Sequence, residues 1–105
     1  GNIAEKLDFY NLKSLTFEKP DIDTFRCLRL AFEAGRQGGS MPTILNSANE
    51  EAVELFLQKK IKFLKIADIV EECMIKIPHK SLKNINDVLE TDLRVRSFIK
   101  NELRL

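Results

Sequence analysis

The strongest constraint on the fold is the spacing of apolar residues between Ser40 and Gln58. Apolar side chains recur there at intervals of three and four residues, which is typical of an α-helix with one buried face. They are Ile44, Leu45, Ala48, Ala52, Val53, Phe56 and Leu57. Ser40 can cap this helix, and Pro42 falls in its first turn, where a missing N–H costs nothing. We therefore predict an amphipathic helix that reaches about Gln58.

An earlier helix is predicted from about Thr24 to Arg36, with Asp23 or Thr24 as its N-cap and Gly38-Gly39 as its stop. This helix is apolar over most of its circumference. Its narrow polar stripe consists of Arg26, Arg29, Glu33 and Arg36. A helix of this kind packs against more than one neighbour. In so small a domain, we expect part of this surface to contact another domain.

Two further helical segments complete the pattern. A third helix is predicted from about Leu64 to Met74, and Cys73 lies on its apolar stripe. After Pro78, a short helical turn is predicted at Ile85 to Leu89. Thr91 then caps a last helix that nearly reaches Leu105. The side chains of this helix predicted to face the bundle are Val95, Phe98, Ile99 and Leu103.

The predicted fold class is all-α, a four-helix-bundle-like domain over residues 23–105. An irregular linker precedes it at residues 1–22, with one short extended segment at Leu15 to Phe17. A chain of 105 residues with 44% hydrophobic and 31% charged residues makes one globular domain. Cys27 and Cys73 are distant and outside any CxxC pair, so both are predicted to be reduced core thiols.

The charge and the apolar runs disfavour two classes of partner. A net charge of +1 creates no strong field toward nucleic acid. The local basic run, Lys59, Lys60, Lys62 and Lys65, is interpreted as a solvated rim beside a turn. No apolar run approaches the roughly 20 residues that span a bilayer. We therefore expect neither nucleic acid nor membrane as a partner.

No pattern of residues predicts a catalytic, cofactor-binding or metal-binding site. His79 is the single imidazole, and it follows a proline in a predicted surface loop. The glycine pair follows a helix rather than a strand, so it does not match a nucleotide-binding turn. The carboxylate pairs Glu50-Glu51 and Glu71-Glu72 diverge on their helices and are interpreted as solvated faces.

Two asparagines in the second helix are the candidate structural or interdomain residues. Asn49 is predicted to project between Leu45, Ala52 and Phe56, in the middle of the apolar arc, and Asn46 lies at the edge of that arc. A buried amide costs several kcal/mol unless its hydrogen bonds are satisfied. Asn49 therefore bonds either to a carbonyl within the domain or to a partner across a domain interface.

Several stretches of the sequence resemble the C-terminal part of the 1-deoxy-D-xylulose 5-phosphate reductoisomerase family. The likeness covers nearly the whole chain. The matching residues are Leu7-Asp8-Phe9, Leu15-Thr16-Phe17 with Pro20-Asp21, Cys27-Leu28-Arg29-Leu30-Ala31 with Glu33-Ala34, Leu45-Asn46-Ser47-Ala48-Asn49-Glu50, Ile61-Lys62-Phe63, Ile66-Ala67-Asp68-Ile69 and Asp87-Val88-Leu89.

The resemblance implies a parent enzyme with an NADPH-binding Rossmann domain, a central domain that holds Mg or Mn and the substrate, and this helical domain at the end. Such a parent converts 1-deoxy-D-xylulose 5-phosphate to 2-C-methyl-D-erythritol 4-phosphate in the non-mevalonate route to isoprenoids. The resemblance implies a homodimer in the bacterial cytoplasm or the plastid stroma. It also implies that this chain binds no cofactor, carries no catalytic residue and packs on the other domains of the parent.

Two other functions remain open from the sequence. The chain could be a free-standing helical interaction module that presents its first helix to another protein. Alternatively, it could be a small helical nucleic-acid binder that uses the lysine run, which the balanced charge disfavours.

Overall fold

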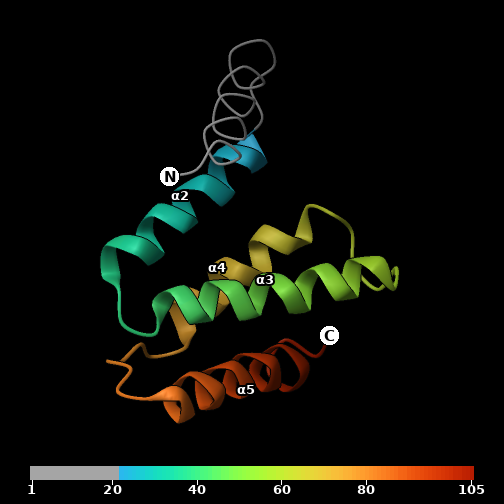
Figure 1. The fold of residues 1–105 in the computed structure, drawn as a ribbon. Coiled ribbons are helices and arrows are strands. Elements are labelled where there is room, and N and C mark those ends of the chain that lie inside the picture. Colours follow the sequence, from blue (N-terminus) through green and yellow to red (C-terminus); the bar gives the residue numbers. More distant parts are fainter. Residues whose placement is uncertain (1–21) are drawn as a thin grey trace, which may run out of the picture.

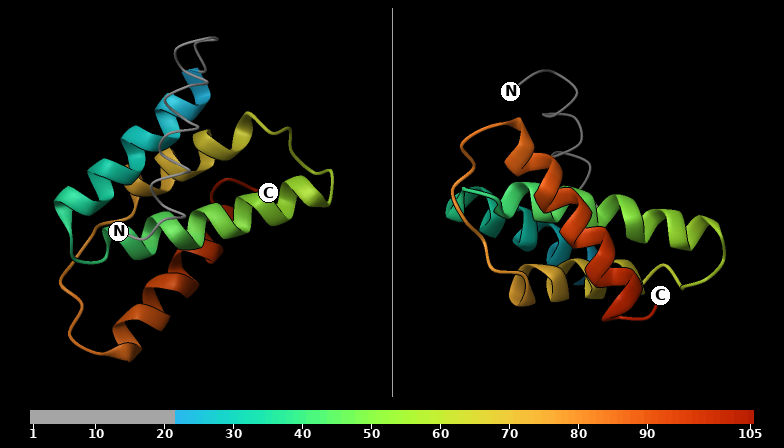
Figure 2. Two further views of the ribbon diagram at one scale, coloured as in Figure 1. Left: turned by 45° about the horizontal axis from the view of Figure 1, so that its top comes forward. Right: turned by 90° about the horizontal axis from the view of Figure 1, so that it is seen from below.

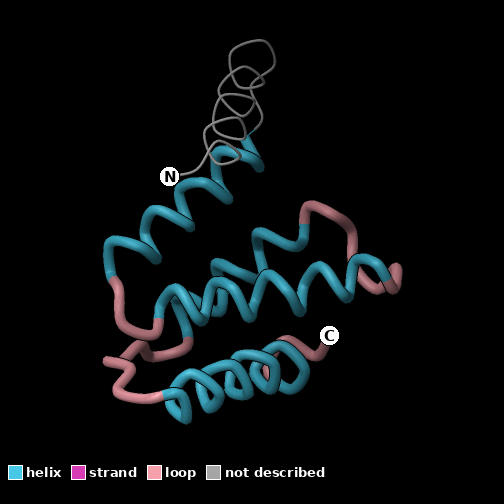
Figure 3. The backbone as a smooth tube through the Cα atoms, in the orientation of Figure 1, coloured by secondary structure: helices cyan, strands magenta, loops and turns pink. Residues whose placement is uncertain are grey.

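The structure, a computed structural model, describes residues 22–105. Within this range the chain forms four α-helices and no strand (Figures 1 and 3). They are α2 (Ile22–Gln37), α3 (Met41–Leu57), α4 (Lys65–Lys76) and α5 (Ile85–Asn101). The predicted all-α class and bundle-like arrangement are confirmed. The predicted linker at residues 1–22 and its extended segment lie outside the described residues, except Ile22, which begins α2.

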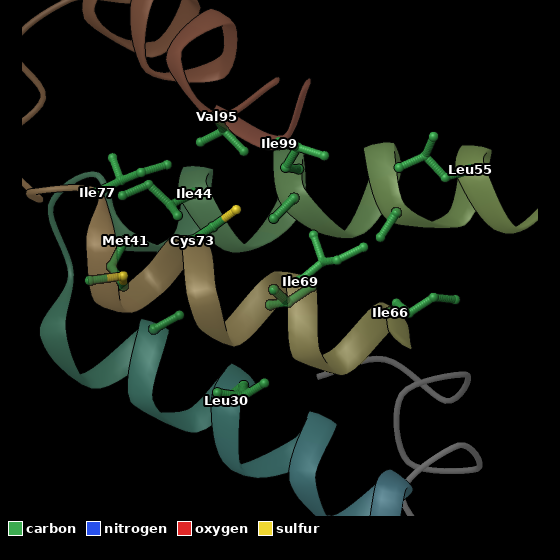
Figure 4. Packing of buried hydrophobic residues seen from close by; sticks show 14 residues of the cluster. Leu30, Met41, Ile44, Leu55, Ile66, Ile69, Cys73, Ile77, Val95 and Ile99 are labelled. Carbon is green, nitrogen blue, oxygen red and sulfur yellow. The ribbon is translucent and has the colours of Figure 1, made fainter. Parts of the chain in front are cut away.

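Helices α3 and α4 form the centre of the domain. Helix α2 packs on one side of this pair and α5 on the other (Figures 2 and 4). The interior of the described bundle is apolar, and its fully buried side chains include Ile44, Ile69, Cys73, Val95 and Ile99. Burying one large aliphatic side chain stabilises a fold by roughly 1.5–3 kcal/mol. This shared core therefore holds the four helices together, and the predicted burial of Cys73 is confirmed.

The corner between α2 and α3 is built on two glycines. Gly38 and Gly39 have φ angles of 67° and 56°, which L-residues with side chains adopt only at a cost. The Gly38 N–H donates to the Ala34 carbonyl oxygen at 3.0 Å, which closes the end of α2. Gly38-Gly39 is therefore confirmed as the stop of this helix.

Ser40 stands at the N-cap position of α3, but its hydroxyl does not cap the helix. Instead, the buried Ser40 Oγ accepts a hydrogen bond from the Lys80 N–H at 2.8 Å. The Ser40 N–H donates in return to the Lys80 carbonyl oxygen at 2.7 Å. Pro42 does lie in the first turn, as predicted. Ser40 thus fastens the α2–α3 corner to the loop between α4 and α5.

The last helix differs from its prediction. The segment at residues 85–89 is the first part of α5, not a separate turn, and Asn84 is the true N-cap. The Asn84 Oδ1 accepts from the Asp87 N–H at 3.1 Å. Thr91 lies inside the helix, buried, and its hydroxyl donates to the Asp87 carbonyl oxygen at 2.8 Å. The prediction that Thr91 caps the helix is wrong because the better cap lies seven residues earlier.

The other helix ends shift by a few residues. Asp23 and Thr24 lie within α2, so neither is its N-cap. Helix α4 continues to Lys76 instead of ending at Met74, and α5 ends at Asn101. Beyond α5, the Leu103 N–H returns to the Phe98 carbonyl oxygen at 3.1 Å, and this turn stops the helix short of Leu105.

Candidate functional site

One face of α2 is apolar and uncovered. Leu30 and Ala34, four residues apart, point into the core and are 3% and 1% exposed. Phe25, Leu28 and Phe32 share the opposite face by their spacing of three and four residues. Phe25 is 52% exposed and Phe32 69%. Exposed aromatic side chains that gather on one face mark interaction sites. The predicted excess of apolar surface on this helix is confirmed.

Ion pairs to α4 fix which way this face points. The guanidinium of Arg26 bonds to Asp68, and also to Glu71 at 2.7 Å. Arg29 donates to the second oxygen of Glu71 at 2.7 Å. The hydrogen bonds from Arg29 and Arg26 hold the pKa of the Glu71 carboxyl below its ordinary value. Because the arginines of α2 turn toward α4, the phenylalanine face turns outward.

Beside this face lies a hollow of about 200 Å³ between α2, α3 and α4. Apolar side chains dominate its lining. The lining residues are Cys27, Leu30 and Ala31 of α2, Leu45, Asn46 and Asn49 of α3, and Ile66 and Val70 of α4. We call this hollow, together with Phe25, Leu28 and Phe32, the α2–α3 surface. Cys27 is exposed at its rim, so the prediction that Cys27 is a core thiol is wrong.

Asn46 and Asn49 both lie in the wall of the hollow and both are exposed. The predicted burial of Asn49 is wrong because the core-facing arc of α3 is centred on Ile44, Ala48 and Leu55 and leaves Asn49 on its flank. Neither amide side chain has a hydrogen-bond partner within residues 22–105. The internal carbonyl that one alternative required is therefore missing from the described domain.

A polar network that the sequence analysis missed joins α3 to α5. The buried Ser47 hydroxyl donates to Asp92 at 2.6 Å. Arg96 bonds to Asp92 at 3.1 Å, to Glu51 at 3.0 Å and to Glu50 at 2.7 Å. The hydrogen bonds from Arg96 and Ser47 lower the pKa of Asp92. The spacing of Asp92 and Arg96, four residues apart, was the signal in the sequence.

The ion pairs of Arg96, and those of Arg26 and Arg29, correct the interpretation of the paired carboxylates as solvated faces for one carboxylate of each pair. Glu51 and Glu71 are half-buried, and both bond to arginines. Among residues 22–105, no group of three or more His, Cys, Asp or Glu side chains could hold a metal ion. Each acidic cluster surrounds a guanidinium instead. His79 and the four lysines of the rim are exposed, as predicted. The exposed apolar face of α2 and the hollow beside it therefore suit binding to another protein surface.

Comparison with known proteins gives consistent matches. A family profile described as "DXP reductoisomerase C-terminal domain" matches residues 2–98. A 1-deoxy-D-xylulose 5-phosphate reductoisomerase from Clostridium novyi is 58% identical over 100 residues, which cover 95% of this chain. Relatives with the same name from Clostridium kluyveri and Clostridium beijerinckii are both 54% identical, over 95% and 92% of the chain.

In each of these relatives the matched segment is 26% of the length, so the chain spans about a quarter of the proteins that it matches. No solved structure matches the chain significantly. Of the helices in residues 22–105, none combines the length and apolar character that a membrane span requires.

Proposed function

Because this chain belongs to the DXP reductoisomerase C-terminal domain family, we propose that it is the non-catalytic C-terminal helical domain of a 1-deoxy-D-xylulose 5-phosphate reductoisomerase. The observation that carries the proposal is the match of residues 2–98 to a family of C-terminal domains. The relatives are longer, and the segment that this chain matches is 26% of their length. The parent converts 1-deoxy-D-xylulose 5-phosphate to 2-C-methyl-D-erythritol 4-phosphate with NADPH and a divalent metal, in the non-mevalonate pathway of isoprenoid biosynthesis.

The domain supports the catalytic domains of the parent by packing on them. An uncovered apolar helix face supports this role, because a monomeric domain seldom leaves clustered aromatic side chains in water. The alternative of a free-standing interaction module has no support from the comparisons, since the matched relatives all extend well beyond the matched segment. The nucleic-acid alternative rests on four exposed lysines in a chain of net charge +1 and is not proposed.

NADPH and Mg or Mn belong to the preceding domains in this proposal. The described residues do not fit either group. Arg96 already sits among Asp92, Glu50 and Glu51, and Arg26 sits between Asp68 and Glu71, so a cation would compete with a guanidinium in both clusters. The turn with Gly38 and Gly39 follows a helix and lacks the strand that a dinucleotide-binding turn requires.

We place the parent in the bacterial cytoplasm, because the matched relatives come from Clostridium. The plastid alternative has no support among them. We also propose that the parent is a homodimer, as the family resemblance implies. Light scattering of the graft described next tests this proposal, and a monomeric mass at micromolar concentration would refute it.

A graft of this chain onto a relative tests the proposed function. In the Clostridium novyi enzyme, the matching C-terminal quarter is replaced by this chain, and the same enzyme truncated before that quarter serves as control. NADPH oxidation with 1-deoxy-D-xylulose 5-phosphate and Mg²⁺ is measured for both proteins. We expect the graft to turn over and the truncated enzyme to be inactive or unfolded. A graft no better than the truncated enzyme, or turnover by the isolated chain, would contradict the proposal.

A further inference from the structure

We propose that the α2–α3 surface is the docking face for the domain that precedes this one in the full-length relatives. On this proposal, which rests on the proposed function, one large apolar side chain of that domain enters the hollow beside α2. The amides of Asn46 and Asn49 bond to the partner's backbone at its rim. Phe25 and Phe32 supply the aromatic contacts around it.

The outer face of α2 can be buried without stranding a charge. Arg26 and Arg29 already bond to carboxylates of α4, and Glu33 bonds to Arg36 at 2.7 Å. A partner that covers Phe25 and Phe32 therefore meets apolar surface whose neighbouring charges are paired. Burying an unpaired charge is strongly unfavourable, and this arrangement avoids it.

The size and chemistry of the hollow indicate what enters it. An apolar cavity of about 150 Å³ takes a benzene-sized group. The hollow has a volume of about 200 Å³, enough for one aromatic or branched aliphatic side chain. The two asparagine amides each offer N–H donors and a carbonyl acceptor. Covering them with a purely apolar surface would leave these groups without hydrogen bonds, whereas a polypeptide backbone supplies matching donors and acceptors.

The occupant is the preceding domain because, in the longer relatives, that domain is covalently joined to the segment that this chain matches. The chain spans 26% of its relatives, and the matched family is named as the C-terminal domain, so most of a relative precedes it. The uncovered face belongs to α2, which begins at Ile22. A tethered partner meets this face at an effective concentration of about millimolar or more, which favours it over a second copy of the chain.

A second exposed apolar stripe, on α5, fits this partner less well. It consists of Ile85, Leu89 and Leu93, which are 69%, 55% and 68% exposed. By helical spacing, Arg96 and Lys100 fall within the same stripe, so a partner that covers it also covers two cationic side chains. Helix α5 lies on the opposite side of the α3–α4 pair from α2 (Figure 2). Leu93 therefore offers a matched control for Phe32, which is 69% exposed.

Alkylation of Cys27 reports directly whether the surface is covered. The thiol is exposed at the rim of the hollow in the isolated chain. Iodoacetamide labelling of its peptide is followed by mass spectrometry in the isolated chain and in the graft. We expect labelling in the graft to be slower by roughly tenfold or more, the factor that corresponds to about 1.4 kcal/mol of docking free energy. Phe32→Gln should restore most of the rate in the graft, whereas Leu93→Gln should not.

Asn49→Ala is a second variant that should weaken docking, as Phe32→Gln does. It should accelerate labelling in the graft without lowering the melting temperature of the isolated chain, because the amide has no partner within residues 22–105 and alanine favours the helix. The inference is overturned if Cys27 labels equally fast in the isolated chain and in an active graft, although the proposed function would then stand. Acceleration by Leu93→Gln alone would move docking to α5 and also overturn it.

Two further outcomes identify other occupants. Labelling of the isolated chain that slows with its own concentration indicates a second copy on the surface and overturns the inference. Titration of the isolated chain with the truncated relative, used where circular dichroism shows that relative to be folded, gives the same comparison in trans. Protection of Cys27 in that titration supports the inference, and unchanged labelling at saturating concentration overturns it. Loss of turnover in the unmodified graft refutes the proposed function separately.

Discussion

Replacing Gly39 by alanine should weaken the domain far more than the same change at Gly38. Both glycines have φ angles in the left-handed region, 56° at Gly39 and 67° at Gly38. Alanine pays roughly 1–2 kcal/mol for that conformation, less about 0.4–1 kcal/mol regained through the less flexible unfolded chain. This part of the change in unfolding free energy, about 1 kcal/mol, is common to both variants.

The surroundings of the new methyl group differ. At Gly39 it would lie 2.6 Å from the Lys80 carbonyl oxygen, whereas at Gly38 no atom lies within 4 Å. That carbonyl accepts the N–H of Ser40, which is buried. Moving it away strands a buried donor, at a cost of about 1–3 kcal/mol. Gly39→Ala should therefore destabilise the domain by about 1–3 kcal/mol more than Gly38→Ala.

Urea unfolding of the isolated chain, followed by circular dichroism at 222 nm, measures this difference. Each kcal/mol lowers the melting temperature of a domain of this size by roughly 4–8 °C, so a thermal scan gives an independent check. The slope of the urea transition should be the same for both variants, because the same surface is exposed on unfolding. Equal destabilisation by the two variants would refute the role assigned to the contact between the corner and Lys80.

Three other measurements test the interior and the network. Burial raises the pKa of the Cys73 thiol to about 12, so Cys73 should react with alkylating reagents only after unfolding. Labelling of Cys73 in the folded chain would contradict its place in the core. The pKa of Asp92 is lowered from 3.8, so its contribution to stability is complete above pH 3.8 and is lost as the pH falls through the lower native pKa. Asp92→Asn should reduce the pH dependence of the unfolding free energy, measured with urea, over that acid range. An unchanged pH dependence would contradict the pairing of Asp92 with Arg96. Ile69→Ala should cost about 2–5 kcal/mol in the same urea assay, and a loss below 1 kcal/mol would show that Ile69 is not close-packed.

The helices were predictable from the sequence because their signals are local. Apolar spacing placed α3 and α4 to within two residues, and Gly38-Gly39 marked the end of α2. The start of α5 was missed because Asn84 and Thr91 both resemble caps. Which of them bonds an N–H of the first turn is decided by geometry, not by residue type.

The candidate site was predictable only in part. The apolar excess of the helix with Phe25 and Phe32 indicates an interface from the sequence alone, and both side chains are exposed in the structure. The predicted burial of Cys27 and Asn49 was wrong. Periodicity gives the relative angles of side chains around a helix axis, but it does not give the direction of the core. That direction depends on how α2 and α3 pack together, and on ion pairs such as Arg26 with Glu71 that join distant parts of the sequence.

Hydrogen exchange of α2 tests the docking role of this domain most directly. Among the α2 side chains from Thr24 onward, which the structure describes, only Leu30 and Ala34 are buried in the core, so the amides of this helix should exchange readily in the isolated chain. Exchange is measured by mass spectrometry in the isolated chain and in the graft. We predict that α2 and the start of α3 are protected in the graft, while α5 exchanges as before. Unchanged exchange in α2, or protection confined to α5, would contradict docking through the α2–α3 surface.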